Sequence, residues 1–347
     1  MPLNFSLWPG GAGAEKTARS RLRLCLFLSA FLLVRAACPA GAACPAGEVT
    51  LFVPERAESP LYRIYGLLDA AFKEEIFLRI KPAVRPGRGG SYAISALQDS
   101  KGDSCSMAAV SLPAFFLMSA GWDRLYDAGE IYPFAVIGAI PNALWVDERS
   151  PLRTLEDFLA WARRETVLRG KRLDVAGTGR FTDQHLASLQ LGRATGLRIG
   201  YLPLLGAAES AESAKSGPAA ACWGPAYPLR EMPGLRPLAV AAAKRSPALP
   251  NVPTFLESGC AVQNLVWLCL ALPASTPEAI REKSRAEAAK VLKNPALRQK
   301  LAAFGLTLPG ESEDLERIMD HQKETALKLI RDYALIPKEE IPPKAAW

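Results

Sequence analysis

Short apolar runs alternate with segments of helical periodicity along most of the chain. The run "EVTLFVPE" (48–55) is rich in β-forming residues and predicts a strand. Apolar residues then recur at helical spacing from Leu61 to Phe72, and Ser59 before Pro60 predicts the N-cap and first position of a helix. The segment from 48 to 72 is therefore predicted to form a strand followed by a helix.

The same alternation continues through the middle of the chain, and the last third turns helical. Thr154 and Asp157 have the spacing of a capping box at a helix start. Strands that alternate with helices predict an α/β fold with parallel sheets, whose ligands bind at the carboxyl ends of the strands. Further strands are predicted over 77–84, 131–148, 173–177, 197–205 and 235–242, and further helices from Ala93 to Leu97, from about Gln184, and after Thr276, Asn294 (ending near Gly305) and Ser312.

The N-terminus has the pattern of an export signal. Lys16 and three arginines precede the apolar run 24–34, and small residues follow it, as in a secretory signal peptide. The run is too short to span a bilayer. We therefore expect cleavage near residue 37 and a periplasmic protein. The stretch before Cys38 resembles a lipobox with Arg35 in place of the usual Leu, so a lipid anchor on Cys38 is the alternative to simple cleavage.

Length, composition and charge bear on the number of domains and on the class of partner. With 347 residues, of which 49% are hydrophobic, the chain exceeds the size of a usual single core, and two domains are expected. Removing residues 1–37 takes away five basic residues and one acid, so the net charge falls from +7 to 7 − 4 = +3. So modest a charge gives little reason to expect nucleic acid as a partner.

The cysteines indicate neither a metal site nor a cofactor. They show no CxxC spacing and have no nearby histidine that would complete a zinc site, and we expect no metal and no cofactor. Cys38 and Cys44 lie close enough in sequence to form a disulfide in an oxidising compartment. The other cysteines of the mature chain are expected to be isolated buried thiols.

The segment "GTGRFTDQHLA" (177–187) joins a predicted strand to a predicted helix, so its backbone N–H groups are expected to face a ligand. Gly177 and Gly179 suit a dinucleotide loop, but Thr182 replaces the third glycine of that fingerprint. A carboxylate fits better, because the N–H groups and the side chains of Thr178, Thr182 and Arg180 can all donate to it, and a helix N-terminus favours negative charge. Asp183, the next residue, belongs to the same candidate site.

Two stretches resemble a known family. "AKRSPALPNVPTFLESG" (243–259) and "WLCLALPASTPEAI" (267–280) are similar to the periplasmic solute-binding proteins of tripartite tricarboxylate transporters, the Bug or TctC type. The resemblance implies a type II two-domain clamshell, each domain a mostly parallel sheet flanked by helices. Domain one would comprise 48–137 and 260–347, domain two 138–259, and the hinge crossings would lie near 131–145 and 258–270.

The family's function implies a monomeric receptor that captures a small organic anion, a carboxylate, between its domains and delivers it to membrane transporter subunits. The alternatives are a ligand sensor that partners a membrane sensor kinase, or an enzyme on the same fold. The chain lacks the HExxH and GxSxG motifs and contains two histidines, so nothing in it favours catalysis.

The first loop, "ERAESPLYR" (55–63), departs from the family. Glu58 and Ser59 stand where relatives carry glycines, and Tyr62 stands where they carry Asp. Arg56, Ser59 and Tyr62 are therefore candidate side-chain donors, although Arg56 is equally compatible with a solvated loop charge.

Two further residues complete the sequence-based site. Ser111 is a candidate because it lies at a predicted strand end. Trp223 either presents its indole to the cleft or packs in the core. His185 and Trp267 are expected to be structural.

Overall fold

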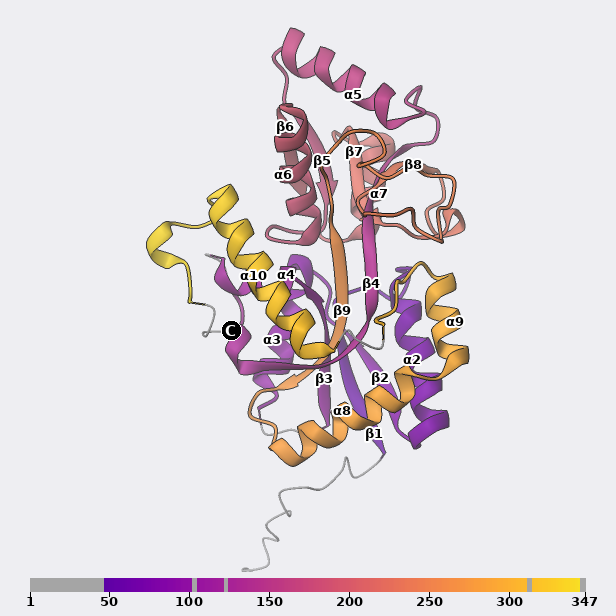
Figure 1. Cartoon of the computed structure of the whole chain (residues 1–347), viewed down its shortest axis with the longest axis vertical. Helices are drawn as coiled ribbons and strands as arrows, with labels where there is room; N and C mark the ends of the chain where they lie inside the picture. Colours follow the sequence, from indigo (N-terminus) through magenta and orange to yellow (C-terminus); the bar gives the residue numbers. More distant parts are fainter. Residues whose placement is uncertain (1–46, 102–104, 122–123, 311–313, 344–347) are drawn as a thin grey trace, which may run out of the picture. The chain divides into compact units, whose positions relative to one another are not determined.

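A computed structural model describes residues 47–101, 105–121, 124–310 and 314–343. The predicted signal segment, together with Cys38 and Cys44, lies outside these residues. Within them, strands and helices alternate as the sequence predicts, and the strands hydrogen-bond in one continuous path. This path divides into two groups of strands that share the long strand β4 (Figure 1).

The first group of strands has a parallel outer part and an antiparallel inner part. β1 pairs with β2 and β3 in parallel, and β3 then pairs with β9 in antiparallel fashion. Helices between the outer strands return the chain to the same edge, which is what parallel pairing requires. The strands are β1 (Glu48–Val53), β2 (Arg79–Val84), β3 (Ser106–Leu112), β4 (Ile131–Asp147) and β9 (Leu265–Pro273).

The second group repeats this plan. β5 pairs in parallel with β6 and β7, whereas β7 and β8 pair with β4 in antiparallel fashion. The strands are β5 (Leu173–Gly177), β6 (Ile199–Pro203), β7 (Ala221–Pro225) and β8 (Leu235–Val240).

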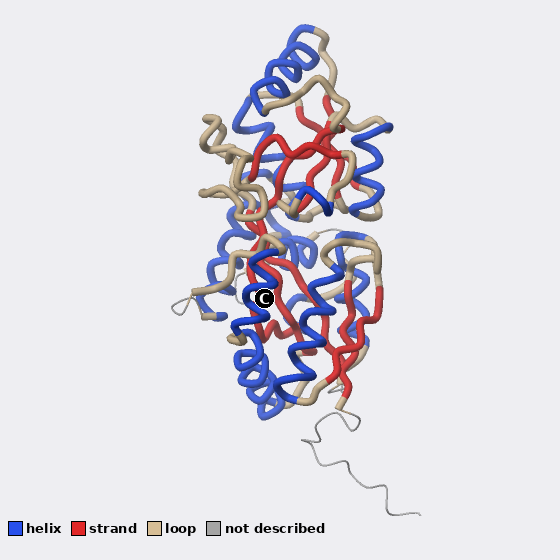
Figure 2. Tube along the Cα trace, turned by 90° about the vertical axis from the view of Figure 1, so that its right-hand side faces the viewer, coloured by secondary structure: helices blue, strands red, loops and turns tan. Residues whose placement is uncertain are grey.

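Helices cover both faces of each group (Figure 2). Buried residues of α2, α8 and α9 share one hydrophobic cluster, and those of α3, α4 and α10 share another. In the second group, α5 and α6 contribute to one cluster, and α7 packs against the other. The helices are α2 (Tyr62–Ile76), α3 (Ser91–Asp99), α4 (Ala114–Ala120), α5 (Leu155–Arg163), α6 (Asp183–Thr195), α7 (Ala207–Ser216), α8 (Glu278–Leu292), α9 (Pro295–Ala303) and α10 (Leu315–Tyr333).

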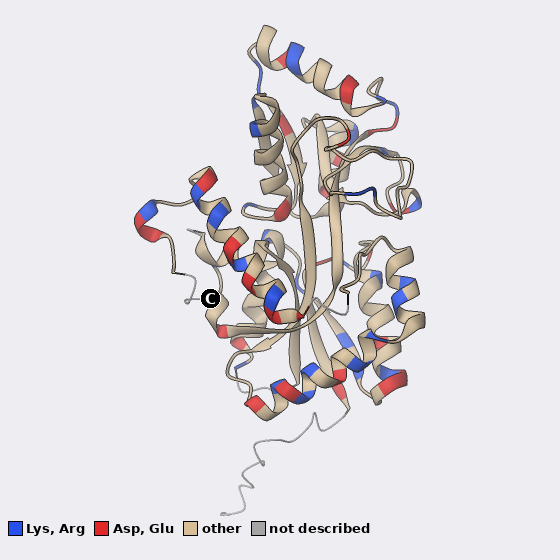
Figure 3. Ribbon diagram, viewed as in Figure 1, with Lys and Arg blue, Asp and Glu red and all other residues tan. Residues whose placement is uncertain are grey.

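The charged side chains follow this layering. Figure 3 shows acidic and basic residues mostly on the helices, whereas the central strands are almost free of them. Apolar strands between amphipathic helices are expected where a sheet is buried on both faces.

Local capping chemistry was predicted well at some helices and wrongly at one. The capping box at α5 is confirmed: the Thr154 hydroxyl accepts from Asp157 N at 3.1 Å, and the Asp157 carboxylate accepts from Thr154 N at 3.0 Å. Asn294 caps α9 as predicted. The prediction of Ser59 as an N-cap is wrong, because Tyr62 N donates to Ser59 O at 3.0 Å in a turn and the helix begins only at Tyr62.

The start of α10 also differs from the prediction. The predicted starting residue, Ser312, lies outside the described residues, and Asp314 caps the helix by accepting from Arg317 N at 2.8 Å.

The expectation of isolated thiols holds for three cysteines and fails for one. Cys222, Cys260 and Cys269 are free and buried. Cys105 is disulfide-bonded, so the expectation that it is an isolated thiol is wrong. A sequence pattern cannot show which cysteines the fold brings within bonding range.

Two asparagines join the strands where the chain passes between the two groups. β4 pairs with β9 up to Pro141 and with β7 from Asn142 onward. At that point the Asn142 amide donates to Asn264 Oδ1 at 2.6 Å, and Asn142 N donates to Asn264 O at 3.0 Å. Both side chains are buried. The residue limits of the two domains and the hinge crossings between them stay predictions.

Replacing Asn264 with alanine tests this junction. Because the Asn142 amide would remain buried without its acceptor, we expect the free energy of unfolding to fall by about 1–3 kcal/mol. Urea denaturation provides the measurement. Gln263→Ala, at the exposed neighbouring position, is the control and should cost much less. Equal losses of unfolding free energy in the two variants would show that the hydrogen bond between the two asparagines does not stabilise the fold.

Candidate functional site

A cavity of about 490 Å³ lies beside the point where β4 passes from one group of strands to the other and β9 begins. Ile137, Ile140 and Asn142 of β4 and Val266 and Leu268 of β9 form part of its wall. Loops and helix starts from both groups supply the rest, over 54–61, 86–90, 178–184, 205–215 and 231–235. The loops at the carboxyl ends of the parallel strands thus converge here, as expected for an α/β protein.

The first loop contributes Arg56 and Ser59 to the cavity wall, whereas Tyr62 does not line it. Arg56 Nη2 lies 3.0 Å from Glu209 Oε1 of α7, so the guanidinium forms an ion pair with the second group of strands. The Arg56 side chain is still half exposed in this ion pair, so its role as a ligand donor stays a prediction. Tyr62 instead packs edge to face against Tyr65, with ring centroids 6.2 Å apart.

The loop between β5 and α6 reaches the cavity through Thr178, Thr182 and Asp183. Its own residues use several of the donors that were expected to face a ligand. Thr178 N donates to Gln184 Oε1 at 2.8 Å, and the Thr182 hydroxyl donates to Gly179 O at 3.0 Å while accepting from His185 N to cap α6. The loop is thus held in shape mainly by its own hydrogen bonds.

Gly177 and Gly179 do not line the cavity but allow close packing behind it. Gly179 adopts a φ of +89°, and a Cβ there would come within 2.8 Å of Gly89 N. A Cβ on Gly177 would come within 2.6 Å of the Tyr201 hydroxyl. Gly179 therefore permits the 177–182 loop of the second group to touch the 86–90 loop of the first.

Asp183 is the most enclosed carboxylate of the cavity wall. Its residue is only 7% exposed, and its Oδ1 has no hydrogen-bond partner among the described residues. Burial raises its pKa to about 7, although hydrogen bonds from backbone N–H groups, including that of Ala114, act in the opposite direction. The carboxyl group is therefore enclosed, with one oxygen that no described residue pairs.

Glu55 is a second enclosed carboxylate, immediately after β1. Its Oε2 accepts from the Tyr65 hydroxyl at 2.7 Å. Burial raises the pKa of Glu55 to about 7, and the bond from Tyr65 offsets only part of that effect. Glu55 was not among the sequence-based candidates. Its position directly after a parallel strand could have indicated it, because ligands of α/β proteins bind at the carboxyl ends of such strands.

The remaining sequence candidates divide between the cavity and the core. Ser111, near the end of β3, lines the cavity. Trp223 does not: it is 2% exposed, donates to Ser188 Oγ at 2.8 Å and packs against Phe255. His185 accepts from Phe181 N at 3.2 Å, and burial lowers its pKa to about 4, as expected for a structural, neutral histidine.

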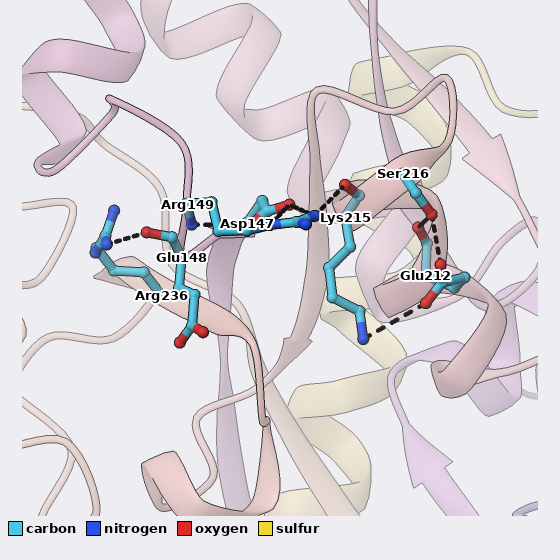
Figure 4. A network of polar contacts seen from close by, with 7 residues as sticks. All are labelled: Asp147, Glu148, Arg149, Glu212, Lys215, Ser216 and Arg236. Atoms are coloured by element: carbon cyan, nitrogen blue, oxygen red, sulfur yellow. Dashed lines mark hydrogen bonds and ion pairs between the residues drawn. The ribbon is translucent and has the colours of Figure 1, made fainter.

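Lys215 is the other basic residue in the cavity wall, and it belongs to a polar network (Figure 4). Its Nζ lies 3.5 Å from Glu212 Oε2 of the same helix. Its backbone carbonyl accepts from Arg149, which also pairs with Asp147. The ammonium group is thus already balanced by a neighbouring carboxylate.

No metal site is present among the described residues: nowhere in them do three His, Cys, Asp or Glu side chains gather closely enough to hold an ion. Across the same ranges, none of the helices combines the length and apolar character needed to cross a membrane.

Comparison with models of protein families shows which family the chain belongs to. Residues 82–335 match the model of the tripartite tricarboxylate transporter family receptor. The chain belongs to this family. A UPF0065 protein from the gbd 5′ region of Cupriavidus necator is 27% identical to this receptor over 227 residues, which are 64% of this chain and 67% of that protein.

Solved structures show the fold of this receptor. Rhodopseudomonas palustris Rpa4515 with adipate matches at a TM-score of 0.73 and 24% identity, covering 84% of this chain and 97% of the other. MatC from Rhodopseudomonas palustris with bound malate matches at 0.70 and 21%, covering 85% and 99%. The predicted fold, a two-domain periplasmic-binding-protein clamshell, is confirmed.

Glu55 makes stability dependent on pH. The unfolded chain loses this proton near pH 4.5, whereas the folded protein keeps it until about pH 7. The folded state therefore loses stability as pH rises from about 4.5 to 7. We expect Glu55→Gln to raise the free energy of unfolding of the ligand-free protein by roughly 1–3 kcal/mol at pH 8, and much less at pH 4.5.

Chemical denaturation at the two pH values measures this difference. Glu58→Gln, an exposed residue of the same loop, is the matched control and should show no such dependence. A Glu55→Gln variant that is destabilised equally at both pH values would contradict the assignment.

Gly179→Ala tests the close approach of the two loops. The variant combines an unfavourable positive φ with a clash against the Gly89 backbone. Gly196→Ala is the control, because Gly196 also has a positive φ of +68°, but a Cβ added to it would meet no atom within 4 Å. We expect Gly179→Ala to cost about 1–3 kcal/mol more in unfolding free energy than the control. Equal losses of unfolding free energy in the two variants would show that the clash with Gly89 adds nothing to the strain of a positive φ.

Proposed function

We propose that this protein is an extracytoplasmic receptor that captures a small organic acid in the cavity and delivers it to the membrane subunits of a tripartite tricarboxylate-type transporter. The observation that carries this proposal is a cavity whose wall is shared by both groups of strands. Its volume of about 490 Å³ lies within the range of small-molecule sites. A solute bound there would contact both halves at once.

The choice of an organic acid has two supports. The two structures of the same fold described above hold adipate and malate, both dicarboxylates. In this chain Arg56, Ser111 and Thr178 bring side-chain donors to the cavity wall. A guanidinium carries five N–H donors, so the ion pair of Arg56 with Glu209 leaves others for a carboxylate.

Affinity requires several of these donors together. Micromolar binding needs about 8 kcal/mol, whereas one hydrogen bond to a charged group contributes about 1.5–3 kcal/mol. Two ion pairs hold the halves together beside the cavity: Arg56 with Glu209 and Arg63 with Glu231, the latter at 2.6 Å. Closure of this kind excludes water that would compete with the solute.

Delivery to a transporter also depends on location. The disulfide at Cys105 suits an oxidising compartment such as the periplasm. We propose that the receptor acts there as a monomer and releases its solute chemically unchanged. Recovery of unaltered solute after prolonged incubation with the protein would support a receptor, and a new product would indicate an enzyme.

Thermal unfolding tests ligand capture directly. The purified protein is stripped of carried-over ligand by reversible unfolding and then screened against mono-, di- and tricarboxylates, amino acids and sugars. A ligand at a hundredfold excess over its Kd stabilises the native state by about 2.7 kcal/mol, so we expect a clear rise in Tm with organic acids. A rise with sugars alone would contradict an organic-acid receptor.

Thr178→Val locates the binding surface. Its side chain lines the cavity, and its hydroxyl makes no hydrogen bond to another described residue, so the change should leave the Tm of the free protein nearly unaltered. We expect affinity for the acid found in the screen to fall about tenfold, the value of one charge-assisted hydrogen bond. Thr50→Val, on β1 away from the cavity, is the control for isothermal titration calorimetry. Unchanged binding would remove Thr178 from the site.

A further inference from the structure

Basic side chains gather at the end of α5 and in the loop that follows it. The segment 163–174 contains five basic and two acidic residues, which gives a net charge of 5 − 2 = +3. This equals the net charge of the whole chain after residue 37, so the rest of that chain is neutral on balance. Arg198 extends the cluster, because its Nη1 donates to Gly170 O at 3.3 Å. The basic cluster consists of Arg163, Arg164, Arg169, Lys171, Arg172 and Arg198.

A buried carboxylate fixes the shape of this segment without neutralising it. A π-helical turn over Arg164–Leu168 follows α5 and closes with a hydrogen bond from Arg169 N to Arg164 O at 3.2 Å. The Glu165 side chain is buried and lies 2.8 Å from Arg169 Nη1 and 3.1 Å from Lys171 Nζ. Both cations remain mostly exposed. One acid thus holds two basic side chains in place at the surface.

Two neighbouring apolar side chains project from the same turn. Val167 is 68% exposed and Leu168 is 79% exposed. Residues about four positions apart lie on one side of a helix, so Arg163 and Arg164 are on the same side as these two residues. Single exposed apolar residues are ordinary, but an adjacent pair among cations combines two kinds of attraction at one point.

The chemistry of this surface suits a membrane better than a protein partner. Protein interfaces are depleted of charged residues at their centre and enriched in aromatic ones. The segment 164–172 has four basic residues and no aromatic residue. Apolar side chains surrounded by Lys and Arg are instead typical of segments that lie in the interface of an anionic bilayer.

We propose that the turn after α5 docks on the surface of a bilayer that carries anionic phospholipids. Val167 and Leu168 insert at the boundary between headgroups and acyl chains, and the basic cluster contacts the lipid phosphates. None of these residues lines the cavity, so this inference goes beyond solute capture and does not depend on which solute binds. Docking would keep the receptor close to a membrane transporter and shorten its search for the membrane subunits.

Co-sedimentation with lipid vesicles tests the proposal on the unaltered protein. The probes are vesicles of phosphatidylcholine alone and vesicles of phosphatidylcholine and phosphatidylglycerol in equal parts. We expect binding to the anionic vesicles only, and we expect about 500 mM NaCl to abolish most of it, because salt screens exposed charges. This comparison needs no variant.

Two double variants then locate the surface. Arg163→Gln with Arg164→Gln leaves Glu165 its closer partners, Arg169 and Lys171, since Arg164 lies 4.0 Å away. We expect partition onto anionic vesicles to fall about fivefold per charge, or about 25-fold in all.

Val167→Ser with Leu168→Ser removes the apolar pair and keeps every charge. We expect a fall in partition of about tenfold or more, because inserted apolar side chains contribute to binding in proportion to their buried area.

Lys293→Gln with Lys300→Gln is the matched control. It removes two exposed positive charges from the α8–α9 region and should change partition by no more than about twofold. All proteins are compared with the same N-terminus, so that the segment before residue 48 contributes equally to each. The thermal shift caused by a solute serves as a check, and we expect it to be unchanged in every variant.

The outcomes divide clearly. Absence of binding to the anionic vesicles would overturn membrane docking and would favour an acidic protein surface as the partner of the basic cluster. Equal losses in the control and in the arginine variant would place the contact elsewhere and overturn the role of this turn. Full binding by the Val167 and Leu168 variant would overturn the insertion of the apolar pair. Each of these results would leave the receptor function standing, since that function is tested by solute binding alone.

Discussion

The antiparallel pairing of β4 and β9 is the constraint on which the rest of the receptor depends. β4 is long enough to pair with β9 in one group of strands and with β7 and β8 in the other. Asn142 and Asn264 join the chain at the point of passage through a buried side-chain bond of 2.6 Å. Asn264 also donates to the carbonyl of Asp183 at 3.0 Å, so the junction and the start of α6 are held together. The cavity lies beside this junction and is shaped by it.

The electrostatics of the cavity follow from the same packing. Carboxylates at the end of β1 and at the start of α6 would be solvated on an isolated loop, but convergence of the two halves encloses them. Enclosure raises the pKa of both Glu55 and Asp183 to about 7. Carboxyl groups with pKa values shifted by burial, which destabilise the ligand-free fold, are typical of functional sites. The ion pairs of Arg56 and Arg63 offset part of the cost by joining the halves.

Much of the architecture could be predicted because its signals are local. The capping box at Thr154, the cap at Asn294 and the strand over 173–177 each depend on neighbours within a few residues, and the structure shows them as expected. The incorrect helix start at Ser59 illustrates the limit of the same rule: a serine before a proline suits an N-cap, but here it precedes a turn that delays α2 by two residues. Cap chemistry alone does not distinguish the two conformations.

The sequence by itself determined the α/β class, the family and the segments that would approach a ligand, because periodicity, strand ends and family motifs are properties of neighbouring residues. Only the tertiary structure decided which groups in those segments are available. It placed Trp223 in the core with Ser188, used the Thr178 N–H for Gln184, paired Arg56 with Glu209 and left an Asp183 oxygen without a donor. How strongly a group is desolvated, and which partner it finds, depend on residues that lie far apart in the chain. Both are therefore decided only when the fold brings those residues together.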